Sequence, residues 1–62
     1  MKAIEVQFYG KPKVYTVIIS NIKYIEDENM DDSINANLIF MDGSEQLLNI
    51  NREQVTELIN RR

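Results

Sequence analysis

The stretch INANLIFMDGSEQLLNI, residues 34–50, decides the fold of this 62-residue chain. Its first part places apolar side chains at every second position, which predicts a strand with one buried face. Asp42-Gly43 follows, and this dipeptide is typical of the two-residue type I′ hairpin turn, which requires a positive φ twice. Residues 46–50 then predict the returning strand. We interpret the asparagines of this hairpin as its solvent-facing side, with binding of a polar ligand as the alternative: Asn35, Asn37, Asn49 and Asn51.

Three more extended segments precede this hairpin. Residues 4–8 alternate apolar and polar side chains, as in a half-buried strand. Gly10 and Pro12 predict a turn, because glycine adopts unusual backbone angles and proline lacks a donor. Residues 14–19 are β-branched or aromatic throughout, which predicts a central strand covered on both faces. Ser20-Asn21 predicts a bend, and residues 22–25 resume the extended pattern.

The C-terminal residues predict a short helix with a well-marked start. Asn51 can cap its first turn, and Gln54 lies at the spacing of a capping box. Residues 55, 58 and 59 form a single apolar stripe along one side. So short a helix is unstable alone in water. We therefore expect the stripe to pack on the sheet or on another subunit.

These segments predict a single α+β domain over residues 1–62. Its architecture is a small antiparallel β-meander of about five short strands followed by one C-terminal α-helix. A twisted, barrel-like sheet with the helix across one face or end is the simplest arrangement. Between residues 26 and 33 we expect a polar loop, because this segment holds half of all the acidic residues.

Length and composition favour association with another protein. A domain of this size hides only roughly 60% of the surface that its unfolded chain exposes. The chain has no Cys and no His, which excludes disulfides and the usual zinc sites as stabilisers. We therefore expect a homo-oligomer, a larger protein partner, or both.

Several features bear on location and source. No apolar run approaches the ~20 residues that span a bilayer, and a polar strand follows Lys2 where a signal peptide would have its apolar segment. We expect no membrane contact and a cytoplasmic location. Frequent Ile, Asn and Lys are typical of AT-rich genes, as in a low-GC bacterium, a phage or another mobile element.

The sequence offers no catalytic constellation. Nucleophilic triads lack a histidine base, and neither glycine belongs to a phosphate-binding loop. A calcium loop starting at Asp27 fails, because Asp32 stands where glycine is needed and Leu38 where a bidentate glutamate is needed. We predict a protein that is not an enzyme and that has no metal site and no cofactor.

The charge is divided unevenly along the chain. Residues 1–25 carry a net charge of +3 and residues 26–62 carry −6, which permits head-to-tail association or a basic face. Tyrosines near lysines on a sheet are also how single-stranded nucleic acid is often held, although strand tyrosines commonly pack across strands. The candidate interaction residues are Lys11, Lys13, Tyr15, Lys23, Tyr24, Arg52 and Arg61.

Residues 14–60 loosely resemble a known family. The run Ile22-Lys23-Tyr24-Ile25-Glu26, the strand of residues 34–40, the turn at residues 42–44 and the segment 50–59 are similar to the small flagellar FlbD-like family. The Lys-Pro pair after Gly10 and the longer acidic loop depart from that pattern. The resemblance implies a similar fold, a non-enzymatic accessory role and no catalytic residue.

The leading interpretation is a small non-enzymatic protein-interaction module that acts as a regulator, inhibitor or accessory subunit. Its contact surfaces would be an exposed edge strand and the short helix. One alternative is a nucleic-acid-binding regulator that uses the Lys/Tyr-rich N-terminal strands. Another is a small-ligand binder whose pocket forms between subunits.

Overall fold

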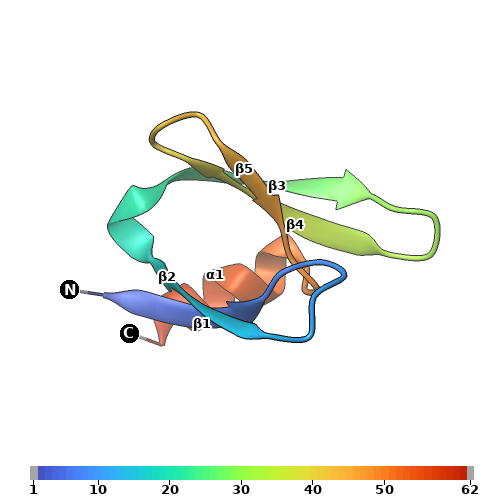
Figure 1. Cartoon of the computed structure of the whole chain (residues 1–62), viewed down its shortest axis with the longest axis horizontal. Helices are drawn as coiled ribbons and strands as arrows, with labels where there is room; N and C mark the ends of the chain where they lie inside the picture. The colour runs from blue at the N-terminus through green and yellow to red at the C-terminus, as the bar shows by residue number, and fades with distance from the viewer. Residues whose placement is uncertain (1, 62) are drawn as a thin grey trace.

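The computed structural model describes residues 2–61. In chain order it contains β1 (Ala3–Gln7), β2 (Val14–Ile18), the 3-10 turn η1 (Ile19–Asn21), β3 (Ile22–Asn29), β4 (Ile34–Phe40), β5 (Glu45–Leu47) and α1 (Arg52–Asn60). β1 pairs with β2, and β3, β4 and β5 pair in sequence, all antiparallel. This arrangement confirms the predicted α+β fold, a five-strand meander followed by one C-terminal helix (Figure 1).

The strands form two sheets, so the barrel-like arrangement is wrong. One sheet has the order β1-β2 and the other has the order β3-β4-β5. The sheets meet where Phe8 bridges to Leu48, next to a 2.9 Å hydrogen bond that the Tyr9 amide donates to the Leu47 carbonyl. The turn Ile19–Asn21 redirects the chain after β2, and β2 does not pair with β3. The sheet therefore stays open on that side.

A single apolar core lies between the two sheets and the helix. Its largest fully buried side chains come from β1, β4, the segment after β5, and α1: Ile4, Leu38, Leu48 and Val55. Leu58 and Ile59 are half-buried against the same cluster. The predicted packing of the helical stripe on the sheet is therefore confirmed, and α1 lies across the space between the two sheets (Figure 1).

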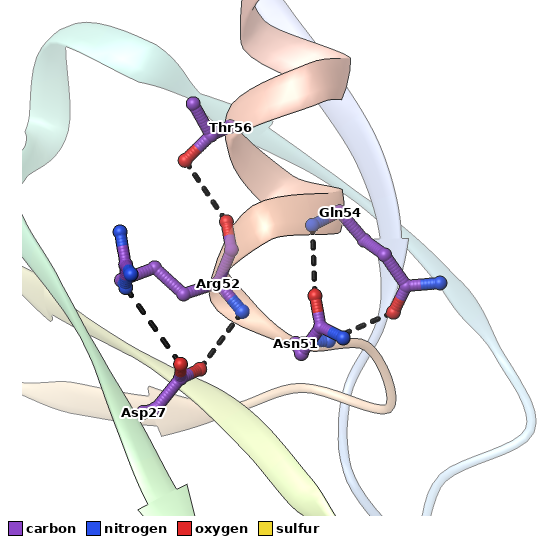
Figure 2. Close-up of polar contacts among 5 residues, drawn as sticks. All are labelled: Asp27, Asn51, Arg52, Gln54 and Thr56. Atoms are coloured by element: carbon purple, nitrogen blue, oxygen red, sulfur yellow. Dashed lines mark hydrogen bonds and ion pairs between the residues drawn. The ribbon is translucent and has the colours of Figure 1, made fainter.

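The helix begins where the sequence predicts. The Gln54 amide donates to Asn51 Oδ1 at 2.9 Å, and the Asn51 amide donates to Gln54 Oε1 at 2.9 Å, so both halves of the capping box are present (Figure 2). β3 adds a third partner, because the Arg52 amide donates to Asp27 Oδ1 at 2.9 Å. The first turn thus satisfies backbone donors that would otherwise lack an intrahelical acceptor.

We expect the substitution Asn51→Ala to lower the free energy of unfolding by about 1 kcal/mol, because the helix loses its capping acceptor. Urea denaturation followed by circular dichroism measures this loss. Asn49→Ala is the matched control, since Asn49 is an exposed asparagine just before the cap. Equal losses in the two variants would contradict the role given to the cap.

The first turn has the conformation that its glycine predicts. Gly10 adopts a φ of +75°, and the Lys11 amide donates to the Phe8 carbonyl at 3.0 Å. A positive φ at the third position of a four-residue turn is what a type II turn requires, and glycine adopts it without strain. The turn therefore closes the β1–β2 hairpin as expected.

The hairpin turn at Asp42-Gly43 differs from the predicted type I′ turn. Of these two residues, only Gly43 has a positive φ, +90°. The Phe40 amide donates to the Ser44 carbonyl and the Gly43 amide donates to the Phe40 carbonyl, which defines a three-residue loop over residues 41–43. Asp42 instead accepts hydrogen bonds from the Ser44 amide and hydroxyl, at 2.9 and 2.6 Å. These local bonds favour the longer loop.

Two further expectations are corrected. β2 is an edge strand, not a central one: Val14 is 62% exposed, and Val17 is its one buried residue. Its β-branched sequence suits any strand, so the composition did not reveal the number of neighbours. The first half of the expected acidic loop is strand, because β3 continues through Asn29 and pairs with β4, which leaves residues 30–33 as the loop.

Candidate interaction surface

The structure distributes the predicted interaction residues over three regions. Lys11, Lys13 and Tyr15 belong to the β1–β2 hairpin, Lys23 and Tyr24 lie near the start of β3, and Arg52 and Arg61 lie at the two ends of α1. The first group belongs to one sheet and the second to the other. The sequence therefore identified exposed cations and tyrosines, but these residues do not share one sheet or one element.

Tyr15 has a packing role. Its ring stacks on that of Phe8, with centroids 3.9 Å apart and an angle of 4° between the planes. Tyr24, by contrast, is 48% exposed. The nucleic-acid interpretation stays a prediction: Lys11 and Lys13 lie on the same hairpin as exposed Tyr9, while Tyr15 already uses one ring face for packing.

Both candidate arginines have carboxylate partners within the chain. Arg52 Nε lies 3.7 Å from Asp27 Oδ2 (Figure 2), and Arg61 Nη2 lies 2.7 Å from Glu57 Oε1 one helical turn earlier. Exposed pairs of this kind add at most about 1 kcal/mol to stability. Their guanidinium groups are partly engaged, which leaves them less suited than the lysines to hold a partner.

The asparagines of β4 are structural, and their assignment to the solvent-facing side is wrong. Asn35 and Asn37 are each 4% exposed. Asn35 Nδ2 donates to the Leu48 carbonyl at 2.8 Å, and Asn37 Nδ2 donates to Glu45 Oε1 at 2.6 Å. Their strand lies at the centre of its sheet, between β3 and β5. Buried amides with such partners stabilise the sheet rather than offer a ligand site.

The free edge of β2 is the feature that best fits an interaction site. The Ile19 amide donates to the Lys2 carbonyl, and the β1–β2 register continues from that pair without interruption. Because hydrogen-bonded positions alternate in an antiparallel pair, the backbone groups of Tyr15 and Val17 face β1. The groups that face away from β1 belong to Val14, Thr16 and Ile18. Within residues 2–61, no strand pairs with this edge.

The edge of β2 also lacks the features that usually protect an edge from another strand. Charged side chains, prolines and bulges discourage pairing at exposed edges. β3, an outer strand of the three-stranded sheet, carries Lys23, Glu26, Asp27 and Glu28 and a register shift near its start. β2 reads VYTVI, with no charge and no proline, and its register is uninterrupted. β5, the other outer strand of the three-stranded sheet, has only three residues and includes Glu45, and β1 carries Glu5 and leads into the bridge between Phe8 and Leu48. β2 is therefore the least protected of the outer strands.

The small-ligand interpretation stays a prediction. A hollow of about 420 Å³, open to solvent, is lined by Asn21, Phe40, Met41, Asp42 and Ser44 at the β4–β5 turn. There the Ser44 hydroxyl and amide donate to the Asp42 carboxylate and hold the pKa of that carboxyl below its ordinary value. These hydrogen bonds lie within the turn, so they explain the lowered pKa of Asp42 without a ligand.

The described residues form neither a metal site nor a membrane-spanning helix. Among residues 2–61, no three acidic side chains come together in a way that could hold a metal ion. The helix in that part of the chain is too short and too polar to cross a membrane. Comparison of the chain with protein-family models, with curated proteins and with solved structures finds no match.

Proposed function

We propose that this chain is a small non-enzymatic protein-interaction module, a regulator, inhibitor or accessory subunit, that docks on its partner through the free edge of β2. The observation that supports the proposal is the unprotected edge itself, with outward-facing backbone groups at Val14, Thr16 and Ile18. An exposed edge of this kind accepts an additional strand, whose main chain supplies the hydrogen bonds.

The non-enzymatic part of the proposal rests on the residues available. The chain has neither His nor Cys to act as a base or nucleophile near neutral pH. Hydrogen bonds within a turn displace the pKa of the Asp42 carboxyl downward. A general acid or base is usually tuned toward neutral pH instead. The resemblance to the FlbD-like family, with its accessory role, points in the same direction.

Side chains of β2 would supply the specificity of docking. Val14, Thr16 and Ile18 point to one face of the sheet, and Tyr15 and Val17 point to the other. A partner strand laid along this edge would meet Val14, the most exposed of these side chains at 62%. Its contacts would therefore be apolar and β-branched, with Lys13 next to the end of the strand.

The substitution Thr16→Pro tests the proposal. Proline at this position removes an amide that faces the free edge and leaves those that face β1, so the fold is expected to persist. The matched control is Asn29→Pro, because the Asn29 amide faces the free edge of β3. Wild type and variants are immobilised, and the proteins retained from a lysate of the host are quantified by mass spectrometry.

We expect Thr16→Pro to lose roughly tenfold or more of the specifically retained protein, since one backbone hydrogen bond and the fit of the strand are lost together. Asn29→Pro is expected to retain as much as wild type. Circular dichroism confirms that all three chains are folded. A wild-type chain that stays monomeric by light scattering and retains nothing beyond what Thr16→Pro retains would contradict the proposed function.

A further inference from the structure

We infer that the partner of the β2 edge is a second copy of this chain, and that the two copies pair antiparallel through β2 about a twofold axis at Thr16. This inference rests on the proposed function, because it uses the same edge. It adds the identity of the partner, the strand direction and the register.

The pattern of outward backbone groups selects this register. Outward-facing groups belong to Val14, Thr16 and Ile18, so an axis at Thr16 sets each outward amide opposite an outward carbonyl of the second copy. An axis at Tyr15 would set Ile18 opposite Pro12, which has no amide hydrogen. An axis at Val17 would set Val14 opposite residue 20, which lies in η1 rather than in a strand.

The side chains of β2 match in the same register. On one face of the extended sheet, Val14 lies opposite Ile18 of the second copy, and Thr16 lies opposite its own counterpart. On the other face, Tyr15 lies opposite Val17. These are the β-branched and aromatic combinations that stabilise antiparallel pairs across strands. Val14, exposed at 62% in the single chain, gains an apolar neighbour.

Charge is compatible with pairing between identical strands. β2 has no charged residue, so no like charges face one another along its length. The nearest cation in the sequence, Lys13, would lie opposite Ile19 of the second copy. Identical strands from β3 would instead bring several carboxylates together near the pairing edge, since Glu26, Asp27 and Glu28 are consecutive. Like charges directly opposite destabilise a pair.

Pairing also addresses a weakness of the single chain. β1 and β2 form a sheet of only two strands, whose stability depends on its packing against α1 and the rest of the core. Two copies joined through β2 make one continuous four-stranded sheet, with β1 at each outer side. A contact between single strands is smaller than the roughly 800 Å² per partner of a standard interface. The dimer is therefore expected to dissociate on dilution.

Single cysteines test the register directly, because the chain has no cysteine of its own. Residues opposite each other in a hydrogen-bonded antiparallel pair have Cα atoms about 5.5 Å apart, within the range of a disulfide. We expect Thr16→Cys to form a disulfide-linked dimer under mild oxidation. Val14→Cys alone should not, because its two copies would lie four residues apart, about 14 Å along the strand.

A mixture of Val14→Cys with Ile18→Cys provides the internal control. These positions face each other in the proposed register, so the mixture should yield the mixed disulfide as readily as Thr16→Cys yields its own. Sedimentation velocity of the cysteine-free chain completes the test. The dimer fraction should rise with concentration, fall strongly in Thr16→Pro and remain in Asn29→Pro.

Two results would overturn the inference. One is equal cross-linking of Thr16→Cys and Val14→Cys, which would indicate random collision or another register. The other is a wild-type chain that remains monomeric at millimolar concentration. In that second case the proposed function would still stand if Thr16→Pro abolished the capture of a different protein. The failures of the two proposals are therefore distinguishable.

Discussion

Replacing Leu38 by alanine is expected to lower the free energy of unfolding by about 2–5 kcal/mol. Leu38 is fully buried at the centre of β4, opposite Ile25 on one neighbouring strand and Gln46 on the other. β4 pairs on both edges and also contacts α1, so the surrounding backbone has little freedom to collapse into the space. Truncating the side chain here removes buried apolar surface and also leaves a cavity.

The size of the domain makes this loss severe. Natural domains have roughly 0.05–0.15 kcal/mol of stability per residue, which corresponds to about 3–9 kcal/mol for a chain of this length. Urea denaturation followed by circular dichroism measures the change. The matched control is Ile34→Ala, in the same strand but 53% exposed, which should lose much less. Similar losses at the two positions would contradict the placement of the core.

Introducing a carboxylate at the core side of the helix, Val55→Asp, is expected to unfold the chain. Val55 is fully buried, and the cluster around it consists of apolar side chains. An ionised carboxylate without a partner in such a cluster costs several kcal/mol, because it loses its hydration. That penalty is comparable with the whole stability expected for a domain of this size.

The neighbouring substitution Thr56→Asp is the control, since Thr56 is exposed on the same helix. Far-UV circular dichroism and the dispersion of amide signals in NMR spectra report whether each variant is folded. We expect native spectra for Thr56→Asp. For Val55→Asp we expect the circular dichroism of an unfolded chain and poorly dispersed amide signals. A native spectrum for both would mean that α1 does not pack on the sheets as described.

These core substitutions differ in kind from those at the β2 edge. Leu38→Ala and Val55→Asp act on the single chain, so any loss of binding would follow from unfolding. Thr16→Pro changes an outward-facing group and is expected to leave the single chain folded. If two copies associate as inferred, the melting temperature of wild type should also rise with concentration, because association stabilises the folded state by mass action.

Local sequence patterns predicted the helix start and the first turn correctly, because the interactions that decide these features are short-range. The capping box of Asn51 and Gln54 and the positive φ of Gly10 depend on residues within a few positions of one another. The same limit explains the error at Asp42-Gly43: the dipeptide indicated a turn, but the hydrogen bonds from Ser44 favoured a three-residue loop. The dipeptide alone did not reveal that competition.

The candidate site was less predictable, because its decisive feature is the absence of a neighbour. The sequence pointed to exposed lysines, tyrosines and arginines, which the structure separates or pairs within the chain. The free edge of β2 followed only from the pairing of strands. An apolar strand that is central and one that lies at an edge have similar compositions, so the composition of residues 14–19 predicts a central strand where the structure has an edge strand.

By itself the sequence determined the order of the elements, the helix start at Asn51 and the apolar stripe that anchors α1. Period-two alternation, capping side chains and glycine turns involve residues close in the sequence, so their effect does not depend on how the elements pack together. Tertiary structure alone decided that Asn35 and Asn37 are buried, that the sheets stay open, and that β2 has an unpaired edge. These properties depend on which segments become neighbours in space, and that outcome is set by the packing of the whole chain.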